Sequence, residues 1–231
     1  MKLLHLYYDL MNLYGEYGNV VVLEKHLKDQ GLDVEVTRKT LGDEFDFNDY
    51  DFIYCGSGLE SNEKIALKDL IKRKDSLLKA ISNNKVILFT GNAMELLGKS
   101  IDDESGLNIV DIETRHTDKR LSGDVVVKNK EFGEMVGFIN KCSIVTNNNC
   151  LFEYVFKDEG LNDGSTGEGY KLNNLIGTHI IGPIMVKNPC FMKYIILKLT
   201  ENINGFKYKD ISYPYEEDSY NVTLNALKNR S

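Results

Sequence analysis

Residues 85–98 read Lys-Val-Ile-Leu-Phe-Thr-Gly-Asn-Ala-Met-Glu-Leu-Leu-Gly, and this stretch decides the fold. The apolar run from Val86 to Phe89 predicts a buried strand, and a helix-forming run begins at Met94, after only four intervening residues. A strand that turns so sharply into a helix holds one side-chain position, here Gly91, above the edge of a sheet. The backbone N–H groups at the start of such a helix can stabilise an oxyanion. The stretch therefore predicts a functional site centred on the turn.

Strands and helices alternate around this turn. Buried strands are predicted at residues 3–8, 34–36, 50–55 and 86–89, and apolar residues have helical spacing at 21–31 and 65–81. The alternation predicts an α/β fold with a mostly parallel central sheet and helices on both faces. Because the carboxyl ends of parallel strands meet at one edge, residues 56–58 and 90–92 should lie on the same rim.

The second half of the chain has a different pattern. Short strands are predicted at residues 125–127, 136–139, 150–156 and 175–181, separated by Gly, Asn and Asp clusters. Mixed or antiparallel pairing is favoured there. Two helices should close the fold, one from near Pro189 and one from about Glu216. With no linker or internal repeat, residues 1–231 are expected to form a single domain.

Composition restricts the partners and cofactors. The chain has 28 Lys and Arg against 35 Asp and Glu, a net charge of −7, which argues against nucleic acid or an anionic membrane as a partner. Its cysteines form no CxxC pair and have no His at ligand spacing, so no metal site and no disulfide framework are expected. The Gly-Lys-Ser at 98–100 follows Met-Glu-Leu-Leu, which lacks the glycines of a phosphate loop. No cofactor is predicted.

Targeting signals are also not expected. The first residues turn polar too early for a signal peptide, and no apolar run approaches the roughly 20 residues that span a bilayer. We expect a cytoplasmic protein with free thiols and no membrane attachment.

Motifs along the chain resemble those of a known family. Residues 6–19 (LYYDLMNLYGEYGN), the Gly56-Ser57-Gly58 loop, residues 136–140 (VGFIN), residues 176–183 (IGTHIIGP) and Asn188-Pro189 occur in the family's order. They are similar to class I glutamine amidotransferases, in the branch of cobyric acid synthase (CobB/CobQ) and of the GatD subunit of lipid II isoglutaminyl synthase. The resemblance implies a flavodoxin-like three-layer sandwich. In that family the domain supplies ammonia from glutamine to an ATP-dependent ligase.

The sequence departs from the family pattern at three positions. The resemblance places Gly91 where the nucleophilic cysteine belongs, and glycine has no atom that can attack a carboxamide. It places Ile181 at the general-base histidine and Ile144 at the arginine that binds the substrate carboxylate. These three losses together predict a chain that does not hydrolyse glutamine.

Substitutes for the missing groups are few. His179 lies two residues before Ile181 and would share its face in a strand, so it is either a displaced base or a structural histidine. Cys55, Cys142 and Thr90 are the candidate replacement nucleophiles, although free cysteines are commonly buried and inert.

The rim and the altered positions define an expected pocket. It is lined by Gly56, Ser57, Gly58, Gly91, Asn92, Ile144 and Ile181. Nearby charged residues have simpler explanations: Glu60 and Glu63 begin a helix, where carboxylates favour the helix dipole, and residues 115–120 are interpreted as an exposed charged loop.

The functional prediction follows from the resemblance and its departures. We expect a glutamine amidotransferase-like protein that has lost glutaminase activity and is a binding or regulatory subunit of a Mur-ligase-like, ATP-dependent synthetase. Its ligand would be an amino acid or a cell-wall precursor. The alternatives are an active glutaminase with a relocated nucleophile, which supplies ammonia to such a ligase, and a free-standing small-molecule sensor.

Overall fold

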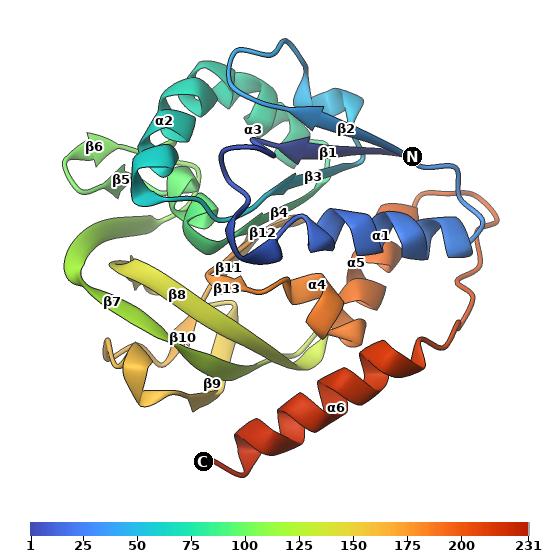
Figure 1. The fold of residues 1–231 in the computed structure, drawn as a ribbon. Helices are drawn as coiled ribbons and strands as arrows, with labels where there is room; N and C mark the ends of the chain where they lie inside the picture. The colour runs from blue at the N-terminus through green and yellow to red at the C-terminus, as the bar shows by residue number, and fades with distance from the viewer. Residues whose placement is uncertain (231) are drawn as a thin grey trace.

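The computed structural model describes residues 1–230, and a six-stranded sheet runs through its centre (Figure 1). Its order is β11-β12-β4-β3-β1-β2. The strands are β1 (Lys2–Leu6), β2 (Glu35–Lys39), β3 (Phe52–Cys55), β4 (Val86–Thr90), β11 (Tyr170–Leu172) and β12 (Leu175–Thr178). All neighbours pair in parallel except β11, which is antiparallel to β12 at the edge. The predicted mostly parallel sheet is confirmed.

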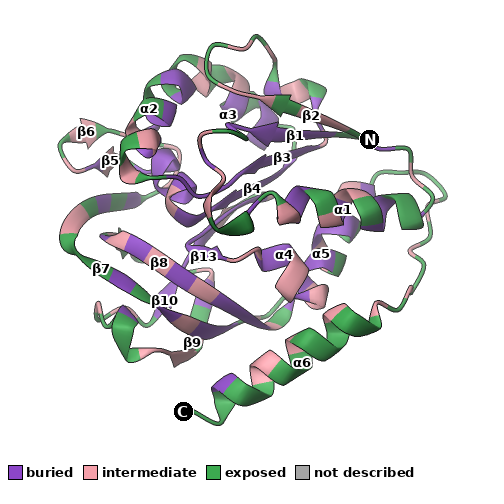
Figure 2. Cartoon of the chain, viewed as in Figure 1, coloured by how far each residue is buried: buried purple, intermediate pink, exposed green. Residues whose placement is uncertain are grey.

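Helices cover both faces of this sheet. On one face lie α1 (Gly18–Asp29), α4 (Ile184–Lys187) and α5 (Pro189–Thr200), and on the other α2 (Glu60–Leu70) and α3 (Lys74–Ser82). Successive side chains of a strand point to opposite faces. Leu3 and Phe52 therefore join the core under α1 and α5, whereas Leu4 and Ile53 join the core under α2 and α3. Figure 2 shows the sheet buried between the two layers.

A second sheet is built on a long hairpin of β7 (Ile112–Asn129) and β8 (Gly133–Asn147). Its remaining strands are β5 (Ser100–Ile101), β6 (Glu104–Ser105), β9 (Phe152–Lys157), β10 (Gly167–Glu168) and β13 (Ile180–Ile181). Except for β5 with β7, these strands pair antiparallel, as the sequence predicted for the second half. Because β13 follows β12 and pairs with β8, it joins the two sheets beside the end of β4.

The charged stretch at 115–120 corrects one expectation. It was interpreted as an exposed loop, but it lies within β7, where the pairing with β8 shifts register between His116 and Leu121. An irregularity of this kind re-aims side chains next to functional sites. His116 consequently contacts the buried carboxylate of Glu63 and the partly exposed carboxylate of Asp102, and it is not fully solvated.

The last helix, α6 (Pro214–Lys228), crosses the hairpin (Figure 1) and packs Leu227 against Val126 and Val136. Glu216 and Glu217 occupy its first turn, as predicted. Across residues 1–230, no helix has the length and apolar character needed to cross a bilayer.

Candidate functional site

The turn predicted from the sequence is present. Strand β4 ends at Thr90 and leads directly into η4 (Gly91–Leu97), a 3₁₀ helix. Gly91 has φ +59°, in the left-handed region that glycine adopts without steric cost. The backbone at Gly91 therefore turns as sharply as an elbow for a nucleophile requires, although the residue carries no side chain.

The space above Gly91 is filled. A Cβ atom built on Gly91 would lie 2.4 Å from Ser57 Cβ, 2.5 Å from Ser57 Oγ and 3.2 Å from Ile181 Cγ2. Approaches below 3 Å are not tolerated by real side chains, so either Ser57 or the turn must shift to admit any residue larger than glycine. The structure thus brings together Gly91, Ser57 and Ile181, but as a packed contact.

Asn92 fastens the glycine-rich loop to the turn. Its Oδ1 accepts hydrogen bonds from the Gly58 N–H at 2.9 Å and from the Ser57 hydroxyl at 3.3 Å. Its Nδ2 donates to the Gly58 carbonyl at 3.1 Å. With both backbone groups of Gly58 bound to Asn92, the loop cannot open without breaking three hydrogen bonds.

A small cavity of about 30 Å³ lies beside the turn, enough for about one water. Ser57, Gly58, Asn92 and Cys142 contribute to its walls, together with Leu13, Tyr14, Leu59, Glu60, Glu95, His116, Arg120, Asn140, Lys141 and Ser143. Arg120 is already occupied, since it donates to Glu60 at 3.0 Å and to Asn140 at 2.9 Å.

Four residues of the expected pocket lie outside this cavity. Gly91 and Ile181 pack beneath it, and Gly56 is enclosed by Met11, Glu16 and Tyr54. The expectation for Ile144 is corrected: its side chain is 45% exposed and lies opposite Arg115. In strand β8 the neighbouring Ser143 points inward, so Ile144 must point outward.

The candidate thiols differ in accessibility. Cys55 is completely buried in the core under α2 and α3, and burial raises the pKa of its thiol well above the usual range. Cys142 lines the cavity, but burial also raises its pKa, despite the opposing charge of Arg120. Neither thiol has a hydrogen bond to an imidazole among the described residues.

His179 is held by two buried glutamates. Its Nε2 lies 2.8 Å from Glu95 Oε1, and its backbone N–H donates to Glu168 at 2.7 Å. The side chain is only 3% exposed. These contacts are those of a structural histidine.

Glu16 organises the site and was not singled out from the sequence. Its buried carboxyl group accepts hydrogen bonds from Tyr54 Oη at 2.8 Å, from the Gly182 N–H at 3.0 Å and from the Thr90 hydroxyl. It thereby ties the amino-terminal segment to the end of β4 and to the turn after β13. Burial raises the pKa of this carboxyl group. Thr90, itself fully buried, is engaged in the same network.

A cluster of Glu63, Glu95 and His116 was also missed. Glu63 does lie in the first turn of α2, but the helix-dipole explanation is incomplete because its side chain is fully buried. Burial, and then the charge of Glu95, raise the pKa of Glu63, while Glu63 raises the pKa of His116 to about 9. One sequence signal was available: Glu63 lies on the helical stripe of Leu67 and Leu70.

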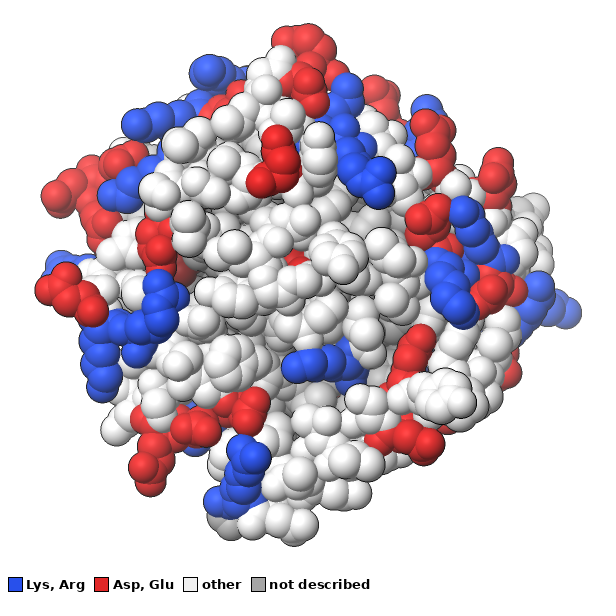
Figure 3. Space-filling model, viewed as in Figure 1, with Lys and Arg blue, Asp and Glu red and all other residues white. Residues whose placement is uncertain are grey.

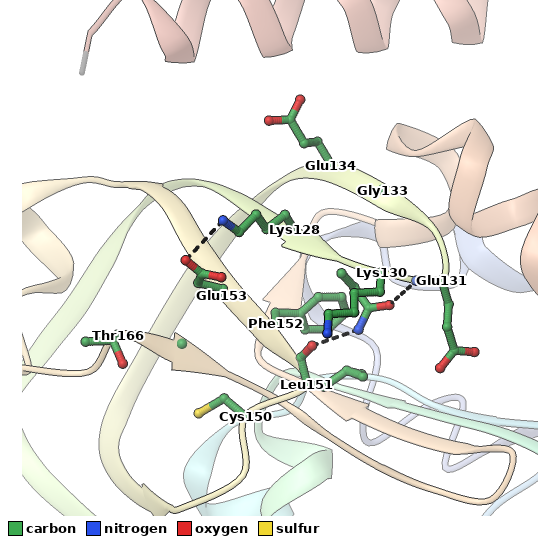
Figure 4. Close-up of a pocket in the computed structure, with 12 residues that line it drawn as sticks. Lys128, Lys130, Glu131, Gly133, Glu134, Cys150, Leu151, Phe152, Glu153 and Thr166 are labelled. Carbon is green, nitrogen blue, oxygen red and sulfur yellow. Dashed lines mark hydrogen bonds and ion pairs between the residues drawn. The ribbon is translucent and has the colours of Figure 1, made fainter.

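A larger hollow lies elsewhere. A cavity of about 750 Å³ opens between the β7–β8 turn and the segment 150–153, with Lys128 and Glu153 paired at 3.1 Å on its wall (Figure 4). None of its lining residues belongs to the Gly91 turn or to the glycine-rich loop.

Comparison with known proteins identifies the family. The sequence model of the CobB/CobQ-like glutamine amidotransferase domain family matches residues 2–189. The chain belongs to this family. The resemblance predicted from the motifs is therefore confirmed.

The relatives of this CobB/CobQ-like chain include two GatD subunits of lipid II isoglutaminyl synthase (glutamine-hydrolyzing). The protein from Staphylococcus aureus (strain N315) is 30% identical over 230 residues, covering 97% of this chain and 95% of the relative. The protein from Streptococcus pneumoniae (strain ATCC BAA-255 / R6) is 29% identical over 227 residues, covering 94% and 86%.

Solved structures show the same fold at low identity. PurLQS from Thermotoga maritima matches with a TM-score of 0.58 and 14% identity, covering 88% of this chain and 99% of that one. The glutaminase domain of Trypanosoma brucei CTPS with bound acivicin matches with a TM-score of 0.56 and 10% identity, covering 90% and 97%. The class I glutamine amidotransferase fold is thus confirmed.

Proposed function

We propose that this CobB/CobQ-like chain is a GatD-type subunit that has lost glutaminase activity and that binds a Mur-ligase-like, ATP-dependent synthetase. The observation that carries the proposal is the contact between Ser57 and Gly91. Substitution of cysteine by glycine alone would leave an empty space at the turn. Here Ser57 and Ile181 fill that space, so the surrounding residues are adapted to a turn without a side chain.

The surroundings of the candidate replacement residues argue against the alternative of a relocated nucleophile. Cys55 is enclosed in the core, and Thr90 is buried in the network of Glu16. His179 is bonded to Glu95, and Cys142 faces Glu60 and Arg120. Nucleophilic catalysis needs a nucleophile and a base within hydrogen-bonding reach of each other.

Glutamine hydrolysis is tested directly. The purified chain is assayed for ammonia release from glutamine, alone and with the synthetase, and intact mass is measured after treatment with a glutamine-analogue diazoketone. We expect neither turnover nor an adduct. The S. aureus relative, whose name states that it is glutamine-hydrolyzing, is the positive control. Turnover, or a mass increase on this chain, would falsify the proposed loss of activity.

The proposed role as a subunit is supported by how much of each relative the chain covers. It matches 95% and 86% of the length of the two GatD subunits, so it is about as long as such a subunit. Figure 3 shows a face whose centre is largely uncharged and whose charged side chains lie mainly toward the rim. Protein interfaces have this character, with few charges and many aromatic residues at the core.

The amino-terminal segment that leads into α1 passes across the front of the molecule in Figure 1. Within this segment and the first turn of α1, Tyr14, Tyr17 and Val21 are 44%, 55% and 49% exposed. We include these side chains in the proposed docking surface. Coexpression of the tagged chain with the synthetase should give a complex in gel filtration. Tyr17→Asp should weaken it by at least tenfold, whereas Tyr215→Asp, at a tyrosine 91% exposed on α6, should not. Separate elution of the wild-type proteins would contradict the partner.

A further inference from the structure

Three potential metal ligands from distant parts of the chain meet beside the cavity. Glu63 comes from α2, Glu95 from η4 and His116 from β7, and one ligand atom of each lies within 4.8 Å of the others. The two glutamate side chains have no exposed surface, and that of His116 is 18% exposed. No single motif contains them, and no metal site was expected from the sequence.

Asp102 holds the His116 ring at its Nδ1 edge. Its Nδ1 lies 2.8 Å from Asp102 Oδ2, and its backbone N–H donates to Asp102 Oδ1 at 2.7 Å. Its buried Nε2 lies at ion-pair distance, 3.3 Å, from Glu63 Oε2, but it has no partner with hydrogen-bond geometry. A carboxylate on the far nitrogen is the usual support of a metal-binding histidine, since it fixes the tautomer and the ring plane.

Each glutamate likewise has one bonded and one unpartnered oxygen. Glu95 Oε1 accepts from the Ser143 hydroxyl at 2.6 Å and contacts His179 Nε2 at 2.8 Å, which leaves Oε2 without a partner. Glu63 Oε2 accepts from Asn92 Nδ2 at 3.4 Å, and its Oε1 is unpartnered. Buried carboxylate oxygens without partners are rare because their desolvation is not compensated.

We propose that Glu63, Glu95 and His116 bind one divalent transition-metal ion, Zn²⁺ or Mn²⁺, with Asp102 as a positioning residue. The donor set of two carboxylates and one imidazole suits such ions. Tetrahedral ligands at about 2.1 Å from zinc lie about 3.4 Å apart, close to the distance between His116 Nε2 and Glu63 Oε2. The remaining gap to Glu95 can be closed by rotation of its terminal torsion, which is soft in glutamate.

The cavity completes the arrangement. Glu95 and His116 both line it, and its volume of about 30 Å³ accommodates one water as a further ligand. The ion would compensate the charge of the two buried carboxylates. This site is independent of the proposed loss of glutaminase activity, because it uses none of the three altered family positions.

Metal content and affinity test the proposal. The chain is purified without chelator for elemental analysis, then stripped with EDTA and titrated with ZnCl₂ and MnCl₂ by calorimetry. We expect one ion per chain and a higher thermal-unfolding midpoint in the presence of the bound ion. Glu63→Gln and His116→Gln should weaken binding by about a hundredfold or more, and Asp102→Asn by about 10- to 100-fold.

Matched controls exclude binding to other groups. His26→Gln removes a histidine outside this cluster, which pairs with Glu216 at 3.1 Å, and it should leave the affinity for the metal ion unchanged. Mn²⁺ disfavours thiolates, so the titration with manganese separates the site from the free cysteines. If the wild-type chain takes up neither ion, or if folded Glu63→Gln and His116→Gln bind as tightly as wild type, the cluster holds only protons and the proposal is wrong. If these variants do not fold, the wild-type and Asp102→Asn titrations decide.

Discussion

Ser57 Cβ and Oγ lie within 2.5 Å of the point at which a Cβ atom on Gly91 would stand. The two residues follow the ends of neighbouring parallel strands: Ser57 lies in the loop after β3, and Gly91 begins η4 directly after β4. Their contact joins the glycine-rich loop to the turn at which the resemblance to the family places a nucleophile. The space that a side chain on Gly91 would need is therefore occupied.

The first prediction concerns this contact. Gly91→Ala should lower the free energy of unfolding by about 2–5 kcal/mol, since it combines a left-handed backbone cost of about 1–2 kcal/mol with overpacking of about 1–3 kcal/mol. Adding Ser57→Gly to the Gly91→Ala variant should restore the part of the unfolding free energy that overpacking removes. Urea unfolding of the two single variants and the double variant measures the coupling.

The chain provides a matched control for the backbone cost. Gly42 has φ +77° and no atom within 4 Å of its built Cβ, so Gly42→Ala should cost only the left-handed term, about 1–2 kcal/mol. Equal losses at Gly42 and Gly91, with no coupling to Ser57, would show that the space above the turn is open.

A second prediction concerns Glu16. Glu16→Ala should lower stability by about 3–5 kcal/mol, because it leaves Tyr54, Thr90 and the Gly182 N–H without their buried acceptor, and each unsatisfied buried donor costs about 1–3 kcal/mol. Glu16→Gln keeps one acceptor oxygen and should cost less. Glu24→Ala removes a partly exposed surface glutamate paired with Lys28 and should cost at most about 0.5 kcal/mol. A Glu16→Ala loss as small as the Glu24→Ala loss would show that the network does not hold the site together.

A third prediction concerns acid stability. His5 is 3% exposed, and burial, followed by the charge of Arg38, lowers its pKa from 6.5 to about 4. The unfolded chain therefore binds a proton between pH 6.5 and 4 that the folded chain does not, so stability falls as pH falls through this window. A difference of 2.5 pKa units corresponds to roughly 3 kcal/mol below pH 4. His5→Phe should remove this part of the pH dependence.

Unfolding of wild type and His5→Phe at several pH values checks the sign. The free energy of unfolding should fall more steeply with falling pH in wild type than in His5→Phe, and only between about pH 6.5 and 4. Parallel curves in that window would mean that His5 has the same pKa in the folded and the unfolded chain.

A fourth prediction concerns the thiols. Cys55 has no exposed surface and a raised pKa, so iodoacetamide should label it only after unfolding, while the exposed Cys150 should be modified in the folded chain. Peptide mass mapping before and after urea distinguishes the sites. Rapid labelling of Cys55 in the native protein would reopen the hypothesis of a relocated nucleophile.

Several features followed from the sequence by itself. The alternation of buried strands with amphipathic helices determined the parallel sheet and its two helical layers, because these periods are local properties of the chain. The run from Val86 to Leu97 determined the sharp turn at Gly91, and glycine was the residue that its left-handed backbone tolerates. Chain order also placed Gly56–Gly58 on the same rim as this turn.

Only the tertiary structure decided what surrounds the turn. Ser57 and Ile181 fill the position of the missing side chain, and Glu16 bonds to groups 38 to 166 residues away. His116 was expected in a loop, but it lies in β7, and the register shift of this strand places it beside Glu63 and near Glu95. Such meetings depend on how strands from distant segments pair and on where one irregularity re-aims a side chain, and no local period in the sequence encodes either.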